Sequence, residues 1–178
     1  MDADLRRPTL HRRLGLSNQV GFTSVVSGIA SLTEALHPTG IPNLFVLTSG
    51  PLPPNPPELL DSQAGRSLFR QIAETSDFVV VDSPPALVMA DAQIVCTMMD
   101  AVVLVVSSIE AHKRELARTT ALVQQTGAKV LGLVLTKVQS HGSHGYGYYK
   151  YSNYASYFEA SPDDDQPDQP NPSSRQSR

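Results

Sequence analysis

One aspartate stands where a short apolar run ends, in the sequence Phe78-Val79-Val80-Val81-Asp82-Ser83-Pro84-Pro85. Three consecutive valines predict a buried strand, and the acid follows at the strand's end. A carboxylate in that position costs free energy unless it serves a cation or a hydrogen-bond network. The layout is that of a Walker B element, whose aspartate orients Mg²⁺ beside a nucleotide. The alternative is that Asp82 caps the following turn.

Two further acids, Asp2 and Asp4, open the chain and precede several arginines. Residues at i and i+2 point to the same side of an extended chain, so the pair could hold a hydrated divalent metal or activate a hydroxyl as a base. The planar guanidinium groups would suit phosphate, and they belong to Arg6, Arg7, Arg12 and Arg13. The alternative is a solvated, charged N-terminal segment.

All six tyrosines fall between positions 146 and 157, behind a Gly/Ser/His-rich stretch at residues 140–145. Tyrosines on a flexible polar arm are not a core pattern, so they are phosphate acceptors, a self-association patch or a base-stacking platform. Only Lys150 is basic there, which argues against nucleic acid. The candidate acceptors are Tyr146, Tyr148, Tyr149, Tyr151, Tyr154 and Tyr157.

Alternating apolar runs and amphipathic stretches must position these side chains. The runs predict strands buried on both faces at residues 44–47, 78–81, 101–106 and 130–135. Helices are predicted at residues 57–75, 90–99 and 110–126, with Gly127 closing the last. This alternation predicts an α/β fold, a parallel sheet flanked by helices, whose ligands bind at the carboxyl ends of the strands.

The composition fits a single domain of 178 residues with a net charge of −3. One cysteine, Cys96, excludes a disulfide framework and a cysteine-based zinc site. No apolar run reaches the roughly 20 residues of a membrane helix, and the first residues lack a secretory signal, so we expect a cytoplasmic chain. Residues 161–178 contain no apolar side chain, which predicts a disordered tail.

Taken in order, these motifs resemble the catalytic domain of bacterial tyrosine kinases, the P-loop kinases of capsular and exopolysaccharide synthesis. The resemblance covers about residues 1–157. It would make residues 1–137 the C-terminal part of the kinase domain, residues 138–160 a flexible tyrosine cluster and residues 161–178 the tail. The motifs are Asp2-Ala3-Asp4-Leu5-Arg6-Arg7-Pro8, Ser49-Gly50-Pro51 with Pro53-Pro54-Asn55-Pro56 and Glu58-Leu59-Leu60, then Asp82-Ser83-Pro84-Pro85 and the tyrosines.

The resemblance implies a fold of the MinD and ParA type and a role for each acid. Asp2 and Asp4 match the Walker A′ motif, in which the first acid lies by Mg²⁺ and is the base for the tyrosyl hydroxyl. Asp82 matches the Walker B aspartate, which holds Mg²⁺ through its water shell. ATP and Mg²⁺ would be the cofactors, and the tyrosine arm would be the substrate, phosphorylated in trans.

The resemblance also implies partners. The chain would join a ring-shaped homo-oligomer at the inner face of the cell membrane. A membrane-bound polysaccharide chain-length regulator would activate it, and a tyrosine phosphatase would reverse its modification. Nucleic acid would not be a partner.

One departure from the family pattern is decisive for activity: no G-x-x-x-x-G-K-[ST] motif occurs in the chain. The resemblance places that Walker A loop, with its strand and helix, before the point where this sequence begins. We therefore expect these 178 residues alone to be inactive and some apolar sheet faces to be uncovered. Two alternatives stay open: a regulatory ATPase of the MinD or ParA type, and a non-catalytic phosphoacceptor.

Overall fold

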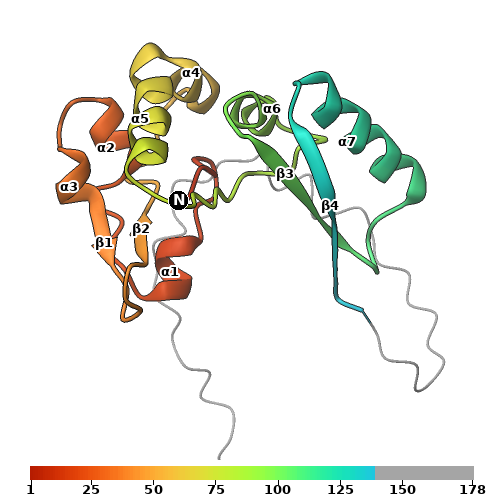
Figure 1. Cartoon of the computed structure of the whole chain (residues 1–178), viewed down its shortest axis with the longest axis horizontal. Coiled ribbons are helices and arrows are strands. Elements are labelled where there is room, and N and C mark those ends of the chain that lie inside the picture. Colours follow the sequence, from red (N-terminus) through yellow and green to blue (C-terminus); the bar gives the residue numbers. More distant parts are fainter. Residues whose placement is uncertain (139–178) are drawn as a thin grey trace, which may run out of the picture. The chain divides into compact units, whose positions relative to one another are not determined.

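Residues 1–138 are described by the structure, which is a computed structural model. Its C-terminal part is a strand–helix–strand unit of β3 (Ala101–Ser107), α7 (Lys113–Gln125) and β4 (Lys129–Thr136) (Figure 1). The two strands are parallel, with Leu104 opposite Leu133. Gly127 has φ +85° and turns the chain from α7 into β4, a conformation that glycine adopts without strain. The strands predicted at 101–106 and 130–135 are confirmed, and so is the parallel crossover.

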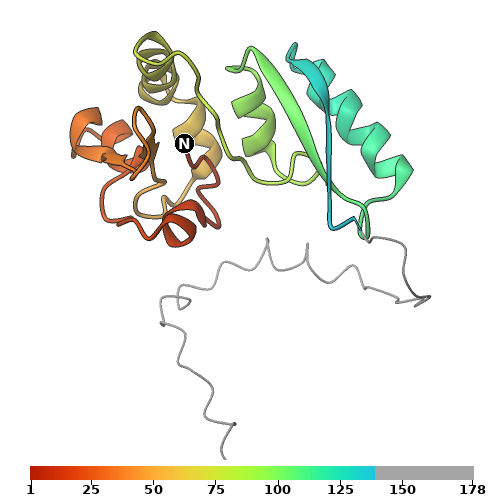
Figure 2. The ribbon, with the colours of Figure 1, turned by 60° about the horizontal axis from the view of Figure 1, so that its bottom comes forward.

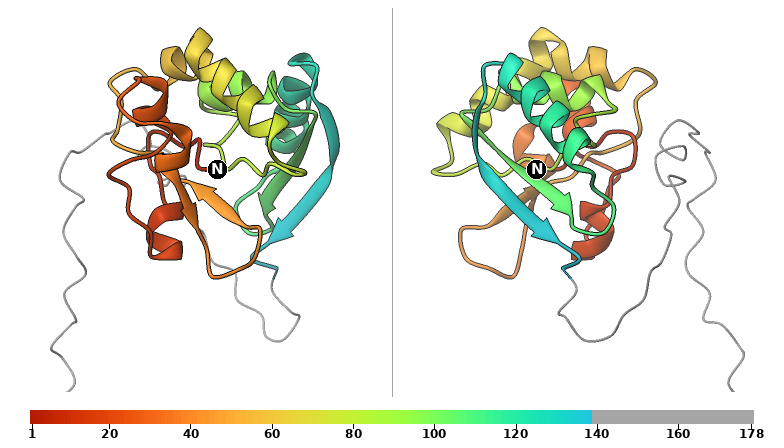
Figure 3. Two further views of the ribbon diagram at one scale, coloured as in Figure 1. Left: turned by 60° about the vertical axis from the view of Figure 1, so that its left-hand side comes forward. Right: turned by 90° about the vertical axis from the view of Figure 1, so that its right-hand side faces the viewer.

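One face of this strand pair is packed and the other is bare. Cys96, Leu104 and Val123 are buried together in one cluster, which joins β3 to α6 (Ala90–Cys96) and α7 (Figure 3). The alternate side chains are exposed, so the prediction of strands buried on both faces is wrong here. No helix among residues 1–138 covers them, in keeping with the expected uncovered sheet face. They are Val103, Val105, Leu131, Leu133 and Leu135.

The N-terminal part carries three short helices and a second strand pair. Strand β1 (Leu36–Pro38) pairs with β2 (Phe45–Leu47), and the pair is antiparallel rather than parallel. The six residues between them are too few for a crossover, so only a hairpin is possible. Asn43 lies in that connection with φ +62°. The helices are α1 (Leu10–Leu14), α2 (Phe22–Val26) and α3 (Leu32–Ala35).

The single helix predicted at residues 57–75 is two helices, α4 (Pro56–Asp61) and α5 (Gln63–Glu74), which run in different directions (Figure 2). Ser62 separates them with an extended ψ of 155°, and its Oγ accepts a hydrogen bond from the Gly65 amide. A serine that caps a new helix competes with continuing the old one, which explains the break. Phe69 of α5 packs on Phe22 with ring centroids 5.7 Å apart.

The segment predicted as a strand at residues 78–81 is not part of a sheet ladder. It makes backbone hydrogen bonds only near its end, where Val80 and Asp82 meet the first residues of the chain. Phe78 and Val80 are 91% and 81% exposed. The prediction is therefore wrong in its extent, because the residues that pair with this segment are too few to build a ladder.

The tyrosine cluster and the tail after Lys137 and Val138 lie outside the described residues. The predictions for Tyr146–Tyr157 and for residues 161–178 therefore stay predictions. Within residues 1–138, no helix is long and apolar enough to cross a membrane.

Candidate active site

Backbone pairing brings Asp2 and Asp82 to the same place. The two residues form an isolated parallel bridge, in which the Ala3 amide donates to the Asp82 carbonyl at 2.8 Å and the Asp82 amide donates to the Met1 carbonyl at 2.9 Å. On its other side, the Asp2 amide donates to the carbonyl of Leu47, the last residue of β2, at 2.9 Å. The sequence-predicted acids at positions 2 and 82 are therefore neighbours at the ends of adjacent extended segments.

The carboxylates of Asp2 and Asp4 are buried and held by backbone amides. Asp2 accepts hydrogen bonds from the amides of Asp4 (3.2 Å) and Leu10 (3.1 Å), and Asp2 is 0% exposed. Asp4 is 6% exposed and accepts from the amides of Arg6 (3.1 Å) and Arg7 (2.9 Å). The interpretation of a solvated N-terminal segment is therefore wrong. The chain bends after Asp4, so the simple extended geometry expected for the pair does not continue.

The local electrostatics of the site disfavour the charged form of two acids. Burial raises the pKa of Asp2, and the neighbouring carboxylates of Asp82 and Asp4 raise it further. The hydrogen bonds that Asp2 accepts from two backbone amides lower the pKa and offset part of this shift. The pKa of Asp82 is also raised: the surrounding protein removes part of its hydration, although the residue keeps exposed surface, and Asp4 adds repulsion. The N-terminal ammonium and Arg13 partly offset that shift. Like charges gathered in this way would be relieved by a bound cation.

The donor set fits Mg²⁺. Carboxylate oxygens are hard ligands, and Mg²⁺ is usually held by one or two of them while it keeps several waters or phosphate oxygens. Among residues 1–138 no group of three or more His, Cys, Asp and Glu side chains forms a ready-made metal shell. A site with few protein ligands, completed by water and nucleotide phosphate, is thus the kind these acids could provide.

Sequence reasoning missed one part of the site, Asp91. This residue lies in the first turn of α6, is 0% exposed and accepts two hydrogen bonds from Arg6, from Nε at 2.7 Å and from Nη2 at 3.2 Å. The interpretation of Arg6 as a phosphate-binding group is therefore wrong in this structure, because its guanidinium is engaged by Asp91. An acid among the apolar residues of a predicted helix was the signal that could have found the pair.

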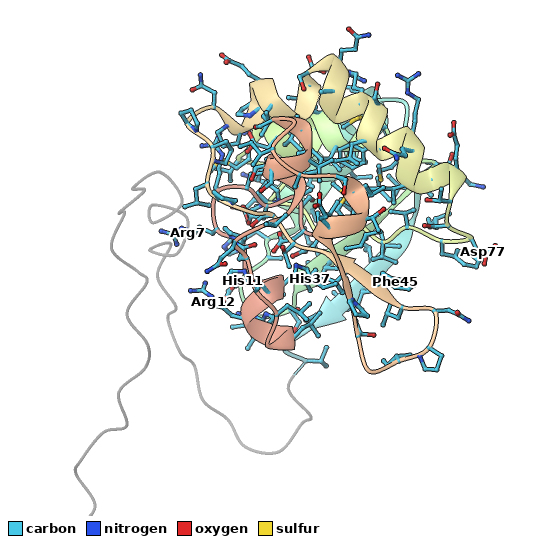
Figure 4. All side chains as sticks on the ribbon, turned by 90° about the vertical axis from the view of Figure 1, so that its left-hand side faces the viewer. Arg7, His11, Arg12, His37, Phe45 and Asp77 are labelled. Carbon is cyan, nitrogen blue, oxygen red and sulfur yellow. The ribbon has the colours of Figure 1, made fainter. Side chains whose placement is uncertain are left out.

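One further arginine, Arg13, lies near an acid of the site. Arg13 lies close enough to Asp82 to lower the pKa of its carboxyl, and it belongs to α1. Figure 4 shows Arg7, His11 and Arg12 projecting from α1 and the segment before it. Cations beside the acidic edge are compatible with the phosphate contacts expected from the sequence.

The loop after β2 is fixed by one amide side chain. Asn18 accepts from the Gly50 amide at 3.0 Å and from Ser49 Oγ at 3.1 Å, and it donates to the Gly50 carbonyl at 3.0 Å. Gly21 and Gly50 approach so closely that a Cβ at position 21 would lie 2.3 Å from the Gly50 nitrogen. These contacts hold the start of the loop in place, close to the hydrogen bond between the Asp2 amide and the Leu47 carbonyl.

Comparison with known proteins gives consistent relatives, although no protein-family model matches the chain. The chain is 40% identical over 143 residues to the tyrosine-protein kinase YwqD of Bacillus subtilis, a match that covers 79% of this chain and 60% of that protein. It is 37% identical over 118 residues to the tyrosine-protein kinase CpsD of Streptococcus pneumoniae, covering 66% of this chain and 52% of the relative. The chain thus spans less than two thirds of these relatives.

Solved structures agree in fold. The crystal structure of the chimerical protein CapA2B2 matches with a TM-score of 0.75 and 37% identity, covering 78% of this chain and 62% of that one. The kinase domain of the Escherichia coli tyrosine kinase ETK matches with a TM-score of 0.74 and 31% identity, over 83% and 58% of the two chains. The cell-division ATPase MinD of Pyrococcus furiosus, at 22% identity and a TM-score of 0.61, shares the fold. The predicted α/β fold of the MinD type is confirmed.

Proposed function

The chain is a homologue of the bacterial tyrosine-protein kinases, and from this premise we propose that its acidic edge is the cation-binding part of an ATP-dependent tyrosine autokinase. The observation that supports this most directly is the bridge between Asp2 and Asp82, which brings two acids with raised pKa values to one edge of the fold. Nucleotide binding with Mg²⁺ is in keeping with relatives that are kinases and with the ATPase fold.

Each residue has a part in the proposed chemistry. Mg²⁺ bound with ATP would neutralise charge on the transferring phosphoryl group. Asp82 and Asp2 would hold the ion, partly through water. Asp2 also accepts the proton of the tyrosyl hydroxyl, and its raised pKa makes it a better base than an ordinary aspartate. Asp4 anchors the turn at Arg6 and Arg7 and adds negative charge beside Asp82.

The tyrosine arm is the proposed substrate. The clustered hydroxyls at positions 146–157 are phosphorylated in trans by a neighbouring copy in a homo-oligomer, and several phosphates on one arm would separate copies by charge repulsion. The modification controls capsular or exopolysaccharide synthesis and export, at the inner face of the membrane, with a membrane-bound chain-length regulator as activator and a tyrosine phosphatase to reset it.

The 178 residues alone are proposed to be inactive. Phosphoryl transfer depends on positioning and charge stabilisation, much of which a phosphate loop supplies, and the sequence contains no such motif. The isolated chain with ATP and Mg²⁺ should give no hydrolysis and no phosphotyrosine. Robust activity of the isolated chain would contradict this part of the proposal.

Phosphotyrosine mapping in the native cells tests the function. We expect phosphate on the 146–157 arm when polysaccharide is made, retained in Asp77→Asn and lost in Asp82→Asn. Asp77 is the matched control, because it is an exposed acid in the same segment (Figure 4). An arm that stays unmodified in the native protein would favour a MinD-type regulatory ATPase instead. An arm still labelled in Asp82→Asn would mean that the chain is an acceptor for a separate kinase.

A further inference from the structure

The ion pair between Arg6 and Asp91 connects the two acid-bearing segments of the chain. The guanidinium donates from two nitrogens to the two oxygens of one carboxylate, at 2.7 Å and 3.2 Å. Asp91 is 0% exposed, and the side chain of Arg6 is 32% exposed. The pair is therefore more buried than the Arg66–Asp61 pair beside α5, whose side chains are 43% and 53% exposed. In a bidentate pair with a buried carboxylate, the relative orientation of both side chains is fixed.

The Arg6 end of the pair lies next to the acids at the start of the chain. The Arg6 amide donates to Asp4 Oδ1, so the residue that reaches Asp91 with its side chain also orients the Asp4 carboxylate with its backbone. Asp4 in turn donates its own amide to Asp2. A displacement of Arg6 would thus shift Asp4, and Asp4 would in turn shift Asp2, because each residue is hydrogen-bonded to the next.

Asp91, at the other end of the pair, comes shortly after Asp82 in the sequence. Asp82 is succeeded by the two prolines at 84 and 85, and the Met89 amide donates to the Pro85 carbonyl at 3.1 Å just before α6 begins. Asp91 lies in the first turn of that helix. The N-terminal segment and the segment after Asp82 are thus linked twice: by the backbone bridge between Asp2 and Asp82, and by the side chains of Arg6 and Asp91.

We propose that Arg6 and Asp91 are positioning residues, which hold the segment of Asp2 and Asp4 in register with Asp82 so that the carboxylates converge on one cation. This rests on the proposed function for the identity of the cation, and on geometry alone for the positioning. Arg6 contacts no substrate in this role, and Asp91 acts only through Arg6.

Two variants separate positioning from simple stabilisation. Arg6→Lys keeps the positive charge beside Asp91 but removes the fork that makes two hydrogen bonds, and Asp91→Asn keeps the shape of the acceptor but removes its charge. Asp61→Asn is the control, because it breaks an ion pair that lies in a different part of the fold, beside α5.

Amide hydrogen exchange of the full chain is the first measurement. We expect the amides that donate to Asp2 and Asp4, those of Asp4, Arg6, Arg7 and Leu10, to exchange about tenfold faster or more in both variants. Amides of β3 and β4 should keep their rates, and Asp61→Asn should change none of these. Wild-type rates at the four amides, or an equal acceleration throughout β3 and β4, would overturn the positioning role.

Mn²⁺ binding to the same proteins, followed by calorimetry, is the second measurement. We expect affinity to fall about tenfold in Arg6→Lys and Asp91→Asn, as when outer partners of metal ligands are removed. Faster exchange with unchanged Mn²⁺ affinity would overturn the link from the pair to the cation site. If the wild-type chain binds no Mn²⁺, the cation site of the proposed function fails, while the exchange rates still decide whether the pair positions the acids.

Discussion

Asp2 and Asp82 face each other across a single parallel bridge, and the pKa of each carboxyl lies above its ordinary value. The backbone hydrogen bonds on both sides of Asp2 fix this arrangement whatever the ionisation of the side chains. The folded chain therefore holds like charges close together, and protons or cations at this edge are expected to stabilise the fold.

Acidification provides a test with a defined sign. Because the folded-state pKa of Asp82 is raised, the folded chain binds a proton there more readily than the unfolded chain, so its contribution to stability rises as the pH falls from about 7 toward the carboxyl range. Asp82→Asn cannot titrate and should lack this contribution. Urea unfolding at a series of pH values should show the wild type gaining stability relative to Asp82→Asn on acidification. A constant difference between the two proteins would refute the raised pKa.

Removal of the Asp82 charge should weaken cation binding. We expect Asp82→Asn to bind Mn²⁺ at least about tenfold more weakly than the wild type, because one of few protein ligands is lost. Asp77→Asn removes the same charge from an exposed position and should bind as the wild type does. Calorimetric titration of the three proteins makes the comparison. An equal loss of Mn²⁺ affinity in both variants would show that only the net charge of the protein matters.

The close approach at Gly21 predicts a sharp steric effect. An added Cβ would meet the Gly50 nitrogen at 2.3 Å and the Thr48 carbonyl oxygen at 2.4 Å, both of them backbone atoms. Gly21→Ala should destabilise the fold by about 1–3 kcal/mol, as overpacking does. Gly40→Ala has open space around the new methyl group and serves as the control, with an expected change within about 0.5 kcal/mol. Denaturant unfolding measures both, and similar values would contradict the close packing.

The bare face of the β3–β4 pair predicts a contrast between adjacent residues. Leu104 is 7% exposed, and Leu104→Ala should cost about 2–5 kcal/mol of stability. Val105 is 69% exposed, and Val105→Thr should cost less than about 1 kcal/mol. Guanidinium unfolding of each variant gives the two numbers. A large loss at Val105 in the isolated chain would mean that this face is covered.

The hydrophobic periodicity and the turn-forming residues of the sequence predicted much of the fold. The unit of β3, α7 and β4 was predictable because each strand is a run of branched apolar residues and Gly127 marks the end of the helix. The break at Ser62 was not, since the helical pattern continues across it and only the side-chain cap on Gly65 decides against one helix. The strand predicted at residues 44–47 is β2, but its antiparallel partner β1 was missed because only three residues form it.

The site was predictable where an acid follows a strand-like run and unpredictable where it depends on tertiary pairing. Asp82 was identified because it follows an apolar run, and Asp2 from its spacing to Asp4 and from the family resemblance; the structure brings the two together. The Arg6–Asp91 pair joins residues 85 positions apart, and the local sequence around either residue does not indicate its partner. The assignment of Mg²⁺ to Asp2 and Asp82, with Asp4 beside them, stays a prediction, as does phosphorylation of the tyrosine arm.

The bridge that pairs the two acids also joins two segments that are far apart in the sequence. Met1 bonds to Val80 across a separation of 79 positions, whereas β3, α7 and β4 contact one another through nearby sequence. Long loops close slowly and local contacts form first. On a ribosome the bridge between Asp2 and Asp82 cannot form until the segment around Asp82 has left the exit tunnel, although β3, α7 and β4 are made later still.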